Sequence, residues 1–131
     1  MAFRLGNTGR NGAASGLGIE MDAGLIQIYT GTQPALVGDA PTGSILGTCT
    51  FGNPAFGSPV SGLITADTIT PDTTADDTGL AGMFRIRDSG DTLTIADGTA
   101  GQGGEDLVFD NASIIAGGTI SITGFTITVP I

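Results

Sequence analysis

Short runs in which apolar and polar residues alternate fill the chain from Gly24 onward, and loops rich in glycine, proline and aspartate separate them. Alternation with a period of two is typical of strands that bury one face. The runs are LIQIYTG (25–31), SILGTCTF (44–51), LITADTIT (63–70), LAGMFRIRDS (80–89), TLTIAD (92–97), DLVFD (106–110) and TISITGFTITVPI (119–131). Seven or eight short strands roughly ten residues apart are typical of an antiparallel β-sandwich or jelly-roll-like barrel. We therefore predict an all-β domain over residues 24–131.

The segments between these runs are predicted to be loops, because proline and glycine interrupt a strand ladder. They include GTQPALVGDAPTG (31–43), GNPAFGSPVSG (52–62) and the glycine-rich GTAGQGGE (98–105). We expect Phe56 to anchor the second loop to the core, because it is the one large apolar side chain of that loop.

Residues 1–23 follow a different pattern, in which apolar side chains recur at approximately helical spacing. Asn11 is a candidate N-cap for such a helix. The helical positions are Ala13, Ala14, Leu17 and Met21. Glycines, each of which costs about 1 kcal/mol relative to alanine in a helix interior, interrupt the segment at Gly12, Gly16 and Gly18. The segment is therefore predicted to be either a short helix that forms when packed, or an extended arm bound to a partner.

The last predicted strand changes phase at Thr123–Gly124. Ile120 and Ile122 share one parity, whereas the apolar residues after the glycine share the other. In a regular strand, this shift would turn one half of the apolar side chains to solvent. We therefore predict a β-bulge, or a bend between two sheets, at this point.

The chain has no lysine or histidine and only four arginines, two of which, Arg85 and Arg87, lie two positions apart in one predicted strand. On a strand, these two would share the outer face with Met83, while Phe84 and Ile86 would face the core. One interpretation is a solvated face neutralised by nearby carboxylates, among them Asp88 and Asp91. The other is a contact with a second protein, for which the planar guanidinium is well suited. The candidate partner-contact residues are Arg85, Arg87, Arg4 and Arg10.

Composition excludes several functions. A net charge of −9 disfavours contact with nucleic acid and with anionic membranes, and no apolar run is long enough to cross a bilayer. Without histidine, the chain has no Ser-His pair and no ordinary zinc site, and Cys49 lacks an activating base. We expect Cys49 to be a small buried hydrophobe, and we predict no catalytic residue, cofactor or metal.

The aspartates leave one alternative open. Hard oxygen ligands gathered in loops suit calcium, but local Asx turns are a sufficient explanation for aspartates in turns. The two clusters comprise Asp72, Asp76 and Asp77, and Asp88 and Asp91.

Four segments resemble a common group of small tailed-bacteriophage proteins. They are GLIQIYTGTQPAL, ILGTCTFGNPAFG, ADTITPDTTADDTGLAGMFRIRDS and SIIAGGTISITGFTITVPI, and the likeness runs in the same order from Arg10 to Ile131. Members of this group open with an alanine-rich helix, continue through an IYTGTQP strand-turn and end in a strand similar to SIVAGGTVSVTSFTITVP. The glycines of residues 12–18 depart from that helix.

The resemblance implies a virion structural protein without enzymatic activity. Its foremost expectation is a capsid decoration, or cement, protein on the outer capsid surface, bound to the major capsid protein and to copies of itself as a homotrimer. Such a protein would occupy the host cytoplasm during assembly. A tail or neck component is the alternative, and a module that binds host glycans is a third reading, disfavoured because the chain has only seven aromatic residues.

Overall fold

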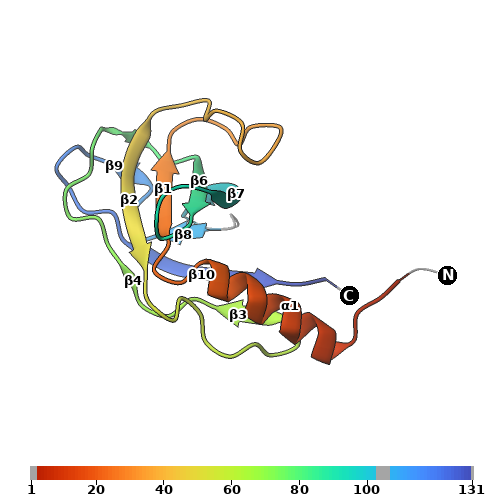
Figure 1. Cartoon of the computed structure of the whole chain (residues 1–131). Helices are drawn as coiled ribbons and strands as arrows, with labels where there is room; N and C mark the ends of the chain where they lie inside the picture. Colours follow the sequence, from red (N-terminus) through yellow and green to blue (C-terminus); the bar gives the residue numbers. More distant parts are fainter. Residues whose placement is uncertain (1–2, 103–106, 131) are drawn as a thin grey trace.

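The computed structural model describes residues 3–102 and 107–130 (Figure 1). One helix precedes ten strands in these residues. The elements are α1 (Asn7–Glu20), β1 (Leu25–Tyr29), β2 (Ile45–Phe51), β3 (Leu63–Thr65), β4 (Ile69–Thr70), β5 (Gly79–Leu80), β6 (Met83–Arg87), β7 (Thr94–Gly101), β8 (Leu107–Phe109), β9 (Ser113–Ile114) and β10 (Ile122–Thr128). The predicted all-β class is therefore confirmed, with a short N-terminal helix.

Eight strands form one curled sheet in the order β3-β10-β8-β7-β6-β1-β2-β4, and β5 pairs with β9 in a separate two-stranded sheet. The run LITADTIT, predicted as one strand, divides into β3 and β4, which lie at opposite ends of this order. Only residues 66–68 connect them, so the sheet curls enough for three residues to link its two ends. Beyond β4, Asp72 and Ile120 form a further antiparallel bridge.

Two details of the predicted sheet were wrong. The expected pairing was antiparallel throughout, but β7 and β8 run parallel. The glycine-rich segment 98–105 was expected to be a loop, whereas β7 continues to Gly101; residues 103–106 of that segment lie outside the described residues. Glycine discourages a strand but does not forbid one when two neighbouring strands supply partners.

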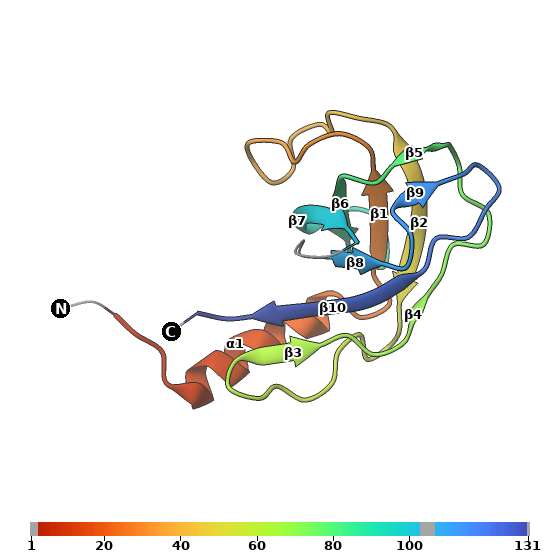
Figure 2. The ribbon, with the colours of Figure 1, turned by 180° about the vertical axis from the view of Figure 1, so that it is seen from behind.

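Helix α1 runs alongside β3 and β10 (Figures 1 and 2). It begins at Asn7, after the N-cap Gly6, so the candidate N-cap Asn11 lies inside the helix instead. The Asn11 side chain instead accepts a hydrogen bond from the Gly62 amide at 2.8 Å. Of the arm-or-helix alternatives, the structure has the helix; Met1 and Ala2 lie outside the described residues.

One of the interrupting glycines, Gly18, makes a close helix–loop contact, whereas a Cβ atom at Gly12 or Gly16 would meet nothing within 4 Å. Gly18 is buried, and a Cβ atom there would lie 3.4 Å from the Phe56 ring. Phe56 itself is 7% exposed, which confirms that it anchors its loop to the core. The lost helix propensity is thus offset by tertiary packing, which supplies most of the stability of short helices in proteins.

The core lies inside the curled sheet, and four phenylalanines occupy its centre. The edge of the Phe84 ring meets Phe125 with 5.5 Å between the centroids. Phe125 also neighbours Phe51 and Phe56, at 6.1 and 6.0 Å. Such tilted and edge-on pairs add to the stabilisation that comes from burial alone.

The predicted bulge in the last strand is confirmed. The register of β10 against β8 shifts between Ile122 and Gly124. The shift keeps Phe125 buried, as Ile120 is before the strand. One extra residue in β10 therefore holds both apolar sets against the core.

Candidate subunit-contact site

The two arginines of β6 lie on the same strand face but in different environments. Arg85 stands opposite Gln27 of β1 and Asp97 of β7 in the strand register, so the three side chains share one face. Both interpretations from the sequence placed that face on the surface of the chain, either solvated or in contact with a second protein. Instead, Arg85 is 6% exposed and Met83 is fully buried.

The segment that covers this face is the β1–β2 loop (residues 30–44). An Arg85 guanidinium nitrogen, Nη2, donates to the carbonyl of Asp39, just past the middle of that loop. Gln33, near the start of the loop, donates from its Nε2 atom to Asp97 Oδ1 at 2.7 Å. The prediction of an exposed Arg85 was therefore wrong, because a loop distant in sequence folds over the strand.

The covered face contains two buried polar atoms without a hydrogen-bond partner, Arg85 Nε and Asp97 Oδ2. They belong to oppositely charged groups on neighbouring strands. Charges of opposite sign offset part of each other's desolvation cost. Arg85 thus holds the β1–β2 loop onto the sheet and presents little surface to another molecule.

Arg87 lies at the open end of the same face and is neutralised locally. Its Nε atom forms a 2.8 Å ion pair with Asp91 Oδ1, and its side chain is 23% exposed. Nη2 donates to the Asp91 carbonyl at 3.0 Å, and Nη1 donates to Thr94 Oγ1 at 2.7 Å. The interpretation of a surface arginine paired with a nearby carboxylate fits Arg87.

The two N-terminal arginines differ in the same way. Arg10 Nε donates to the Val129 carbonyl at 2.8 Å and so fastens α1 to the end of β10. Arg4 is exposed in the segment before α1, next to Phe3, whose side chain is 88% exposed. Among the four candidates, Arg4 is the one whose described surroundings leave it exposed to solvent.

The aspartates mostly hold the backbone of turns. Asp72 Oδ1 accepts from the Thr74 amide at 2.9 Å, and its Oδ2 accepts from Thr48 on β2, also at 2.9 Å. Asp88 accepts from the amides of Thr92 and Leu93 and from the Thr92 hydroxyl. Hydrogen bonds from Thr92 lower the pKa of Asp88 below its usual value.

These contacts agree with the Asx-turn explanation of the acidic clusters. Within residues 3–102 and 107–130, no group of three or more acidic or cysteine side chains is arranged to hold a metal ion. The acidic turns therefore contribute local rigidity to the loops.

Cys49 lies in the core, and its Sγ atom is 3.6 Å from the Ile120 carbonyl oxygen. Burial raises the pKa of its thiol to about 11. Because the thiolate is the nucleophilic form, such a thiol is unreactive at neutral pH. The prediction of a small buried hydrophobe is confirmed.

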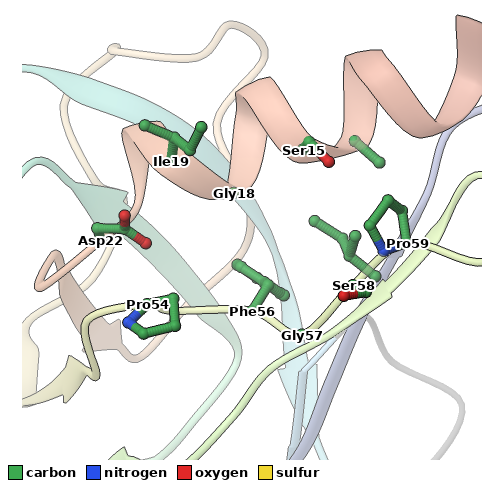
Figure 3. Close-up of a pocket in the computed structure, with 11 residues that line it drawn as sticks. Ser15, Gly18, Ile19, Asp22, Pro54, Phe56, Gly57, Ser58 and Pro59 are labelled. Carbon is green, nitrogen blue, oxygen red and sulfur yellow. The ribbon is translucent and has the colours of Figure 1, made fainter.

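A groove lies between the second half of α1 and the loop 54–59 (Figure 3). It has a volume of about 230 Å³ and is called the helix groove below. Its lining is apolar or small apart from Asp22 at one end, and includes Gly18, Ile19, Pro54, Phe56 and Pro59. Asp22 Oδ1 accepts from the Ala55 amide at 2.8 Å, which ties the loop to the helix end.

Sequence reasoning missed both the helix groove and Phe3. The groove depends on a contact between α1 and a loop more than thirty residues away, which no local pattern encodes. For Phe3 a signal did exist, because an aromatic residue beside an arginine opens a segment otherwise poor in large side chains.

Comparison with known proteins found no family model, no curated protein and no solved structure that matches this chain. Within the described part of the chain, no helix has the length and apolar character needed to cross a membrane. Function must therefore be inferred from the chemistry of the residues and from the resemblance noted above.

Proposed function

We propose that this protein is a non-enzymatic structural component of a tailed-bacteriophage virion, which decorates the outer surface of the capsid. Its partners are the major capsid protein and copies of itself, arranged as homotrimers. It meets the capsid in the host cytoplasm during assembly and remains in the virion.

The observation that carries the proposal is the sequence likeness from Arg10 to Ile131, because it includes segments with defined roles in the fold. GLIQIYTGTQPAL contains β1 and the start of the loop that covers Arg85. The C-terminal segment contains the bulged strand β10. A likeness that includes a covering loop and a bulge extends beyond general β-strand composition.

The use of the polar side chains also supports a structural role. Arg85 and Arg10 donate hydrogen bonds to backbone carbonyls, and Asp72 and Asp88 accept hydrogen bonds from backbone amides. Cys49 is buried, and its thiol has a raised pKa. Groups that hold the fold in this way have little freedom to transfer protons or to attack a substrate.

The aromatic residues argue against the glycan-binding alternative. Sugar sites need exposed rings, and five of the six phenylalanines are buried. Tyr29 is half-buried, and its hydroxyl donates to Gln27 at 3.2 Å. Phe3 is the exposed exception, and it lies in the segment that leads into α1.

The test is a cryo-electron microscopy map of intact particles, combined with the copy number of this chain relative to the major capsid protein. We expect density outside the capsid lattice and hundreds of copies per particle, on the order of the number of lattice positions. Tens of copies or fewer, with density at the tail or neck, would replace capsid decoration with the tail or neck role. Absence from purified particles would overturn the proposal altogether.

A further inference from the structure

We propose that Phe3 and Arg4 of one copy bind in the helix groove of a second copy. The inference refines the self-association part of the proposed function and rests on it only to that extent. It does not depend on where in the virion, or on which surface, the oligomer is used.

The first observation is the position of Phe3. Its side chain is 88% exposed, the largest exposure among the large apolar residues described. Residues 3–6 extend away from the sheet in both views, beyond the first turn of α1 (Figures 1 and 2). Covering such an exposed ring with another surface would remove its apolar area from water and so stabilise the contact.

The helix groove has the size and lining that such a side chain requires. An apolar cavity of about 150 Å³ is enough to bind benzene, and this groove has about 230 Å³. Ile19, at its edge, is 67% exposed and would be covered by the same contact. Pro54 and Pro59 give the loop side of the groove rigid walls (Figure 3).

Charge complementarity favours this chain's own N-terminal segment as the occupant. Asp22, just after the end of α1, is the one charged residue that lines the groove, and exposed Glu20 is the last residue of the helix. Arg4 directly follows Phe3 and is exposed. In a chain of net charge −9, a cation at the contact lowers the repulsion between copies.

The geometry favours binding between copies over binding within one chain. The segment lies before the start of α1, whereas the groove is lined by the second half of the helix. From Asn7 to Gly18 the helix rises about 16 Å. Leu5 packs beside Gly9 at the first turn, so the segment is held at the end of the helix remote from its own groove.

Complementation between two variants tests the proposal. Phe3→Ala removes the occupant and leaves the groove open. Ser15→Trp fills the groove from an exposed helix position and leaves the segment intact. Sedimentation velocity on the full chain would measure association, with Ser15→Ala as the matched control and circular dichroism as the check that each variant folds.

We expect the wild type and Ser15→Ala to associate. Phe3→Ala and Ser15→Trp, each alone, should associate at least about tenfold more weakly, because burial of an aromatic ring is lost. An equimolar mixture should form 1:1 complexes, since the open groove of Phe3→Ala accepts the segment of Ser15→Trp. Asp22→Asn, which keeps the acceptor for Ala55, should weaken association by a smaller factor that added salt reproduces.

Three results would overturn the proposal: a monomeric wild type, unchanged association of Phe3→Ala, or a mixture that fails to form complexes. If Phe3→Ala instead lost only its binding to capsids, the partner of the segment would be the capsid protein. Occupancy of wild-type protein on particles is measured separately, so failure of the decoration role and failure of this contact remain distinguishable.

Discussion

The two faces of the central strands β1 and β6 are both covered, one fully and the other in part, and by different means. One face carries Ile26, Ile28, Phe84 and Ile86 and packs into the main core. The other carries Gln27 and Arg85 and is covered by the β1–β2 loop. The first is held by apolar area, and the second by hydrogen bonds from a few polar groups.

The difference shows how alternation can mislead. A polar residue every second position predicts a solvated face, and it does so correctly at Arg87. At Arg85 the same pattern precedes burial, because a loop from another part of the chain supplies a carbonyl acceptor. Buried arginine is rare without such partners.

The largest expected effect comes from truncating the apolar face. Phe84→Ala should lower the free energy of unfolding by roughly 3–5 kcal/mol, because it removes a ring packed against Phe125 and leaves a cavity. Denaturant unfolding followed by circular dichroism measures the loss. Leu93→Ala, at a position 68% exposed, is the control and should change stability by less than about 0.5 kcal/mol. Similar losses in the two variants would contradict the assignment of this face to the core.

Removing the buried cation should cost less, but it should act on the loop. We expect Arg85→Ala to lose roughly 2–3 kcal/mol, because the Asp39 carbonyl loses a charged donor and Asp97 loses the nearby positive charge. Amide exchange in the β1–β2 loop should quicken more than exchange in the core strands. Adding Asp97→Asn should recover part of the loss, and a purely additive double variant would argue against coupling of the two groups.

The core side of the sheet should also lose stability at alkaline pH through Cys49 of β2, which lies opposite Ile26 in the strand register. A raised thiol pKa in the fold means that stability is fully present below the unfolded value of about 9 and is lost as pH rises toward about 11. Between pH 8 and pH 10 we expect Cys49 to account for a loss of about 1 kcal/mol. Thermal unfolding of Cys49→Ala should lack this part of the pH dependence. An identical slope in both proteins would contradict the burial of the thiol.

The smallest effect is expected at the open end of the polar face. Arg87→Ala should cost about 0–1 kcal/mol, because its ion pair with Asp91 is partly exposed. High salt should reduce that cost further. Comparing its melting temperature with that of Arg85→Ala measures the contrast directly, and a larger loss at Arg87 would reverse it.

Local signals in the sequence predicted most of the strands. Alternation identified the runs, the parity change identified the bulge at Thr123–Gly124, and helical spacing identified α1. Its start was missed because Asn11, a good N-cap residue, is instead engaged by the Gly62 amide. The division of LITADTIT was missed because apolar spacing does not report which strand lies opposite.

The candidate site was less predictable than the fold. Arginine content and net charge pointed to the four cations, but their roles depend on contacts distant in sequence, such as Arg10 with Val129 and Arg85 with Asp39. A rule based on neighbouring residues finds only the Arg87–Asp91 pair, which is four residues apart. A loop that covers a strand face, or a groove between a helix and a loop, exists only once the chain has folded, so no short stretch of sequence predicts it.

The short link between β3 and β4 bears on whether the sheet has free edges at which molecules could associate at high concentration. Free edge strands are templates on which other chains add, and they are a common origin of aggregates. Here the chain turns from one end of the eight-stranded sheet to the other within residues 66–68, and the Ala66 amide donates to the Phe125 carbonyl at 3.0 Å. The outer edge of β3 is occupied by the loop 54–59, whose Gly57 amide donates to the Thr65 carbonyl at 3.1 Å and whose Ala55 carbonyl accepts from the Asp67 amide at 2.9 Å. With one end strand covered and the other, β4, only two residues long, the sheet offers little free edge on which a second chain could add a strand.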